Sequence, residues 1–218
     1  MATRKNGSPF GDFSGSIDTV VFSSWMGIII SKSKPGQRKK KTTSVKLIRQ
    51  NNMFGMVSSF FRSAKQMINM GYQKPKLAKM TPNNAITSYH LKNAMSGDGN
   101  DIGIILSKIK FTFPIRKTQS AWKSVISSVT ENNVTISWET NPFPQKCTQL
   151  DDKVILVYYN KNRGMFYCIW DVIERSDLSF TRDFSKEFAG DEIHWYMFLI
   201  SADGKLVSET DYLGMVTL

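Results

Sequence analysis

Three segments in the second half of the chain are apolar or aromatic on both faces, and they limit what the chain can fold into. They are VILVYY (154–159), MFYCIW (165–170) and IHWYMFLI (193–200). Side chains alternate between the two faces of a β-strand, so strands of this composition bury both faces. A two-layer sandwich alone would leave its outer faces polar. We therefore expect three neighbouring strands whose second face is covered, either by a helix of this chain or by another subunit.

From Ile102 onward the hydrophobic pattern has a period of two, and turn-forming residues recur at intervals of about 8–12 residues. In VTISWET, Val134, Ile136 and Trp138 alternate with polar residues, which is typical of a strand with one buried face. The expected strands are 103–113, 120–129, 133–139, 153–159, 164–170, 178–183, 192–200 and 212–217. Their number and spacing predict an antiparallel β-sandwich.

The first half of the chain has a different pattern. β-Branched residues predict two short strands, 17–23 and 26–31, that form a hairpin with its reversal near Ser24. Apolar residues between Met53 and Ile68 then recur at helical spacing, which predicts a helix over about 43–71 that covers the sandwich. Thr81-Pro82 predicts the start of a second helix.

These patterns predict an α+β protein, in which an N-terminal β-hairpin and two helices pack on a C-terminal antiparallel Ig-like β-sandwich. The expected division is a basic arm, hairpin and helical module over 1–101 and the sandwich over 102–218.

Charge is divided unevenly along the chain. Residues 1–117 contain 20 Lys/Arg and 4 Asp/Glu, whereas residues 118–218 contain 9 and 14, so formal charges of +16 and −5 make up the total of +11. No acidic residue lies between Asp18 and Asp98. The densest basic segment contains Lys32, Lys34, Arg38, Lys39, Lys40, Lys41, Lys46 and Arg49. These eight residues are the predicted polyanion-binding site.

Several interpretations of this charge stay open. The cations can contact the phosphates of DNA or RNA, with Phe10, Phe13, Phe22 and Trp25 available to stack on unpaired bases. They can face an acidic neighbour or packaged nucleic acid in a multi-subunit assembly such as a phage or mobile-element particle. They can also form a solvated loop, and binding to a membrane surface is the least favoured interpretation.

The sequence offers no catalytic constellation. It has no HExxH or paired CxxC spacing for zinc, no GxGxxG or GxxxxGK[ST] loop and no GxSxG elbow. His90 and His194 are expected to be structural, Asp151-Asp152 to be the solvated start of a strand, and Cys147 and Cys168 to be buried free thiols. We therefore predict a protein that is not an enzyme, with no cofactor, metal or small-molecule substrate.

The N-terminal segment lacks the apolar region of a secretory signal, and the longest apolar run is too short to span a bilayer. We expect the protein in the cytoplasm, or in a particle assembled there, and not at a membrane.

The C-terminal part resembles an immunoglobulin-like or fibronectin type III domain. The segments VTISW, KVILVYYN, IHWYMFLISADGK and YLGMVTL carry this resemblance, which implies that Trp138 anchors the core. The whole chain also resembles an uncharacterised bacterial family, a domain of unknown function. Its pattern is present in GDFSG (11–15), Val20-Val21, SWMG (24–27), Lys34-Pro35, Gln50, NNAITSYHLKNA and YLGMV, although the run Arg38–Lys41 is denser here.

That family implies relationship and fold but no reaction. We therefore predict a structural or interaction protein, a subunit of a larger assembly that faces a polyanion. The alternative is a nucleic-acid-binding protein without sequence specificity.

Overall fold

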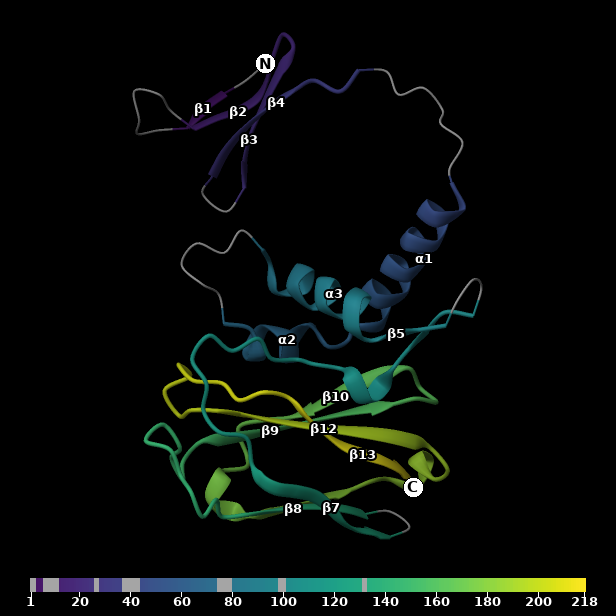
Figure 1. Ribbon diagram of the computed structural model, residues 1–218, viewed down its shortest axis with the longest axis vertical. Coiled ribbons are helices and arrows are strands. Elements are labelled where there is room, and N and C mark those ends of the chain that lie inside the picture. Colours follow the sequence, from purple (N-terminus) through teal and green to yellow (C-terminus); the bar gives the residue numbers. More distant parts are fainter. Residues whose placement is uncertain are drawn as a thin grey trace. The chain divides into compact units, whose positions relative to one another are not determined.

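The computed structural model describes residues 3–5, 12–25, 28–36, 44–73, 80–97, 101–130 and 133–218. The chain forms two compact units, Met1–Ser44 and Val45–Leu218 (Figure 1).

The first unit is an antiparallel sheet in the order β1-β2-β3-β4. Its strands are β1 (Thr3–Lys5), β2 (Asp12–Ile17), β3 (Val20–Trp25) and β4 (Ile28–Ser33). The expected hairpin is present as β3–β4, but Ser24 lies within β3 and pairs with Ile29. A separate turn at Asp18-Thr19 interrupts the predicted strand 17–23, and Asp18 has a positive φ of 49°. Short polar residues such as Asp tolerate this conformation.

The second unit begins with a helical layer. Its helices are α1 (Val45–Phe60), α2 (Lys65–Gly71) and α3 (Pro82–Asn93), followed by the short pair β5 (Met95–Ser96) and β6 (Gly103–Ile104). Thr81 caps α3 as predicted, because its hydroxyl accepts a hydrogen bond from the Asn84 N–H at 3.2 Å. The helix predicted over 43–71 is interrupted at 61–64, where the Arg62 and Ala64 N–H groups bond to carbonyls three residues back.

Seven strands form the sandwich. They are β7 (Trp122–Thr130), β8 (Asn133–Glu139), β9 (Lys153–Asn160), β10 (Met165–Ile169), β11 (Ser179–Asp183), β12 (Glu192–Ile200) and β13 (Asp211–Thr217). One sheet has the order β10-β9-β12-β13 and the other β11-β8-β7, with all pairs antiparallel. The predicted α+β fold with an Ig-like sandwich is thereby confirmed.

The predicted strand 103–113 was wrong beyond β6. After Ile104 the chain makes a short 3₁₀ turn over Leu106–Lys108 and then runs without a partner strand, apart from one bridge between Phe113 and Tyr72. Side chains satisfy its backbone instead. The Lys110 N–H donates to Nε2 of His90, and the N–H groups of Phe111 and Thr112 donate to the hydroxyl of Thr210.

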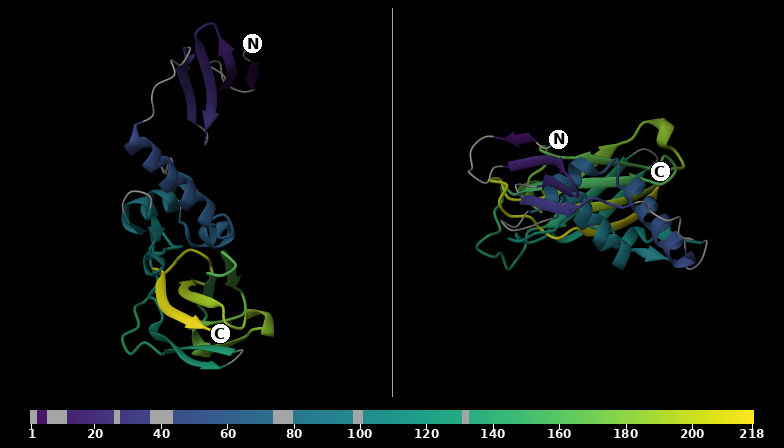
Figure 2. Two further views of the ribbon diagram at one scale, coloured as in Figure 1. Left: turned by 90° about the vertical axis from the view of Figure 1, so that its right-hand side faces the viewer. Right: turned by 90° about the horizontal axis from the view of Figure 1, so that it is seen from above.

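Strands β9 and β12 are buried on both faces, as their composition predicts. One face belongs to a core with Val134, Ile136 and Trp138 of the other sheet. The opposite face packs against the helical layer, with Val57, Phe61, Met67 and Ile68 in the same core as Ile155, Val157, Tyr196 and Phe198. Figures 1 and 2 show the helices of this unit over the four-stranded sheet. A helical segment of this chain is thus the cover, and the expected boundary at 101/102 falls inside a unit with a shared core.

Candidate polyanion interface

The predicted cationic site is divided between the two units. Lys32 lies in β4 and Lys34 directly follows it, both exposed, whereas Lys46 and Arg49 lie in the first turns of α1. Arg38, Lys39, Lys40 and Lys41 lie outside the described residues. Arg49 also has a structural contact, because its Nη2 donates to the carbonyl of Gly97 at 3.2 Å and ties α1 to the loop after β5.

The helical layer carries further cations that the sequence did not single out. Arg62 lies in the turn between α1 and α2, and Lys65 is the first residue of α2; both are exposed. Their neighbours Phe61 and Ala64 are buried in the core. The tight turn therefore directs its apolar residues to the sheet and its cations to solvent.

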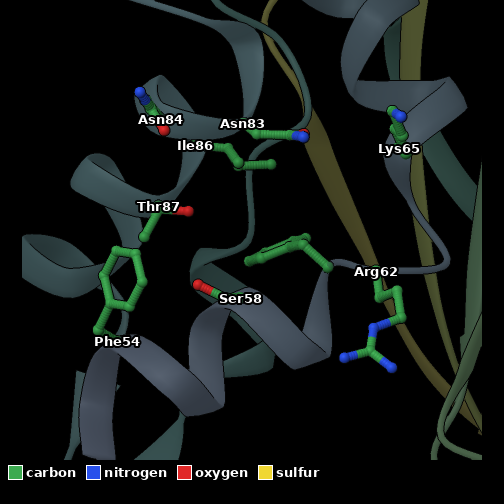
Figure 3. Close-up of a pocket in the computed structure, with 9 residues that line it drawn as sticks. Phe54, Ser58, Arg62, Lys65, Asn83, Asn84, Ile86 and Thr87 are labelled. Atoms are coloured by element: carbon green, nitrogen blue, oxygen red, sulfur yellow. The ribbon is translucent and has the colours of Figure 1, made fainter. Parts of the chain in front are cut away.

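A cleft of about 310 Å³ lies beside these two cations, between α1 and the start of α3. Ser58, Asn83, Asn84 and Thr87 supply hydroxyl and amide groups to its lining, and Phe54 lies beside Thr87 at the end away from Arg62 and Lys65 (Figure 3). Phe54 is 54% exposed, so its ring offers a flat apolar surface. No acidic residue lines the cleft.

The chemistry of this cleft favours anions. A guanidinium binds two phosphate oxygens at once, an ammonium adds a mobile point charge, and amides and hydroxyls complete the hydrogen bonding. The first turn of α3 adds the positive end of the helix dipole. The cations, hydroxyls and amides of the cleft are together suited to binding an anion.

The two histidines have structural contacts, as expected. His90 is fully buried; its Nδ1 donates to the Ile86 carbonyl at 2.7 Å, and its Nε2 accepts the Lys110 N–H at 3.1 Å. Burial lowers the pKa of His90 to about 4. His194 lies between the Tyr212 hydroxyl and Glu192, at 2.9 and 3.0 Å.

One expectation about the acids was wrong. Asp151 is exposed, but Asp152 is fully buried and accepts hydrogen bonds from the guanidinium of Arg175. Its charge is thus satisfied by a cation 23 residues away rather than by solvent. Cys147 and Cys168 are free and partly buried.

The part of the chain that the structure describes contains no cluster of three or more His, Cys, Asp or Glu residues that could hold a metal ion. Within the same residues, no helix combines the length and apolar character needed to cross a bilayer.

No curated protein matches this chain. Two similar solved structures each cover 46% of this chain. The twitchin kinase region from C. elegans has 11% sequence identity and a TM-score of 0.36. The fn3 domain of human collagen alpha-1(XX) has 18% sequence identity and a TM-score of 0.35. The match spans 16% of the twitchin chain and 86% of the collagen domain. Residues 12–214 match the family of unknown function DUF6266, and the chain belongs to that family.

Proposed function

We propose that this protein is a non-enzymatic interaction protein, a subunit of a larger assembly, that binds a polyanion through its basic N-terminal half, in which 19–97 contains no acid. The observation that carries the proposal is the separation of charge inside the second unit. Exposed cations of the helical layer form no ion pair with any described residue; they are Lys46, Arg62, Lys65 and Lys92. No acid occurs in 45–97 to neutralise them.

The sandwich behaves differently. Among the described residues, six of its nine Lys and Arg residues form ion pairs; the pairs are Lys123–Glu139, Lys153–Asp171, Lys161–Glu192, Arg163–Asp191, Arg175–Asp152 and Lys205–Asp203. Paired charges largely cancel at a distance, whereas unpaired ones create a field that attracts an anionic partner. The helical layer is therefore the face of this unit that suits a polyanion.

Nucleic acid is the polyanion that the proposal names first. Its phosphates are regularly spaced, and neutralising them releases counterions, so a set of unpaired cations binds it without reading bases. The first unit adds to this charge, with eight Lys/Arg and two Asp among residues 1–44. A phage or mobile-element particle, the setting expected from the sequence, would present such a partner.

Contacts with other subunits of an assembly must use surfaces other than those of β9 and β12. Val154–Tyr159 and Ile193–Leu199 are buried within this chain. Light scattering at high concentration, with pull-downs from the source cell, tests the assembly part of the proposal. A clean monomer without a partner would count against it.

Binding of labelled single- and double-stranded DNA and RNA across a salt series tests the polyanion part. The variant Arg62→Glu/Lys65→Glu is compared with Lys146→Glu/Lys186→Glu, which makes the same change in net charge on exposed sandwich residues. We expect weaker binding and a shallower salt slope for the first variant, by about 0.9 for each duplex phosphate that is no longer neutralised. Absence of wild-type binding at low salt, or equal losses of affinity in both variants, would refute the assignment.

A further inference from the structure

In the sheet of the first unit, the side chains whose burial is described form no buried core. None of its described side chains, in 14–25 and 29–36, is buried. Sheets in stable domains bury one face against another layer. Something other than the strands themselves must therefore lie against this sheet in the working protein.

Strand register assigns the residues of this sheet to two faces. Val21 pairs with Lys32, and Ser23 pairs with Ile30, so each pair lies on one face. Side chains at i, i+2 and i+4 of a strand share a face, which places Trp25 on that same face. Trp25 is 38% exposed. We call this surface the Trp25 face.

The ladder adds a second cation to the Trp25 face. The Lys34 N–H donates to the Thr19 carbonyl at 2.6 Å, so the pairing of β3 and β4 continues one step beyond Val20–Ser33 and two steps beyond Val21–Lys32. By this register Lys34 lies on the same side as Lys32. At 3.3 Å per residue, Trp25 and the Lys32 row are about 13 Å apart along the strand. An aromatic ring thus lies at one end of the face and two exposed ammonium groups at the other.

The opposite face has a different character. Within 14–25 and 29–36 it carries Ile17, Val20, Phe22 and Ile29 and no cation. Arg4 of β1 also takes a register position on this side, because it pairs with Phe13. Within 14–25 and 29–36, both cations, Lys32 and Lys34, lie on the Trp25 face. A second copy of this chain is disfavoured as the occupant of the Trp25 face, because cations would meet cations. An anion that also has flat apolar groups can pair with Lys32 and Lys34 at one end of the Trp25 face and stack on Trp25 at the other.

We infer that the Trp25 face binds single-stranded nucleic acid, with an unpaired base stacked on Trp25 and phosphates paired with Lys32 and Lys34. This inference rests on the proposed function and names the form of the polyanion. A duplex offers the same phosphates but keeps its bases stacked inside, whereas a single strand exposes base faces to aromatic side chains. Stacking tolerates any base, which agrees with the lack of a base-reading motif.

The test uses the full chain and two probes, an oligo-deoxythymidine strand and a duplex of similar total charge. Trp25→Ala is compared with Trp25→Phe, which keeps a ring, and with Trp170→Ala, which removes an exposed tryptophan from the second unit. We expect Trp25→Ala to weaken single-strand binding by roughly 5- to 150-fold, the range for removal of one base stack. Duplex binding and its salt slope should stay unchanged, and both controls should bind the single strand nearly as tightly as the wild type.

Each other outcome is decisive. Unchanged single-strand binding by Trp25→Ala would overturn the inference and leave the proposed function standing. An equal loss of duplex binding would also overturn it, because a stacking role predicts a selective loss. Absence of any wild-type binding would refute the proposed function, and the inference with it.

Discussion

Nε and Nη2 of Arg175 both donate hydrogen bonds to Oδ2 of Asp152, at 3.1 and 2.9 Å, and both side chains are buried at one end of the sandwich. The other guanidinium bonds go to the carbonyls of Ser120 and Gln119, and the Arg175 carbonyl accepts the indole N–H of Trp138. The pair therefore joins the loop before β9, the start of β7 and the tryptophan of the core.

Removing one partner of the Asp152–Arg175 pair should destabilise the folded protein. We expect Asp152→Ala to lower the free energy of unfolding by about 3–5 kcal/mol, because it leaves a buried guanidinium without its counter-charge. Asp151→Ala, at the exposed neighbour, should change it by less than about 0.5 kcal/mol. Urea unfolding of the two variants measures the difference. Equal stabilities would show that the pair is open to solvent in solution.

His90 predicts acid sensitivity. Burial lowers its pKa from 6.5 to about 4, so the unfolded chain binds a proton that the folded chain refuses. The contribution of His90 to stability is therefore complete above pH 6.5 and is lost as the pH falls towards 4, where the loss reaches about 3 kcal/mol.

Carboxylates also titrate in that pH range. The contribution of His90 is therefore obtained as the difference between the wild type and a variant that lacks the histidine. Free energies of unfolding are measured at pH 7 and pH 4.5 for the wild type and for His90→Gln. His90→Gln should have a lower free energy of unfolding than the wild type at pH 7, but this free energy should fall by less between pH 7 and pH 4.5. Parallel pH profiles for the two proteins would contradict this account of His90.

The helical layer and the sandwich should unfold together. Phe61 is buried in the core that both share, in contact with the rings of His90, Phe111 and Phe166. We expect Phe61→Ala to lower the free energy of unfolding by about 3–5 kcal/mol. The circular dichroism of the helices and the signal of the aromatic side chains should report the same single unfolding transition, shifted to lower stability. Phe54→Ala, at an exposed ring, is the matched control. Two separate transitions would favour an independent sandwich over 102–218.

Hydrophobic patterns among residues close together in the sequence were sufficient to predict most of the strands and helices. The observed bounds of β8 and β12 are those predicted, 133–139 and 192–200, because one alternates cleanly and the other is apolar throughout. The break between α1 and α2 escaped prediction, since the apolar stripe keeps its helical spacing across 61–64.

Long-range partners explain the other errors. Phe111 and Thr112 look like strand residues, but their N–H groups bond to Thr210, about 100 positions away in the chain. Asp152 looks solvated until Arg175 is placed beside it. In the same way, the sequence shows that 19–97 contains no acid, but only folding brings Arg62 and Lys65 to one cleft with Asn83 and Asn84.

The two cysteines should differ in reactivity. Burial raises the pKa of the Cys168 thiol in β10 to about 12, so it holds almost no thiolate at pH 8. Cys147 lies in the loop between β8 and β9. We expect one fast-reacting thiol per native chain with a thiol-specific reagent and two after denaturation, with Cys147→Ser removing the fast one. Two equally fast thiols, or none, would contradict the placement of Cys168.

The run Arg38–Lys41 can be tested although it lies outside the described residues. If it neutralises phosphates, reversing all four charges to Glu should weaken nucleic-acid binding for every sequence and flatten the salt dependence, with the slope changing by about 0.9 for each duplex phosphate that is no longer neutralised. This weakening should add to that of Arg62→Glu/Lys65→Glu if the two surfaces act independently. A quadruple variant with wild-type affinity and slope would assign this charge to solvent or to an acidic protein neighbour, and would leave the helical layer and the Trp25 face as the surfaces to pursue.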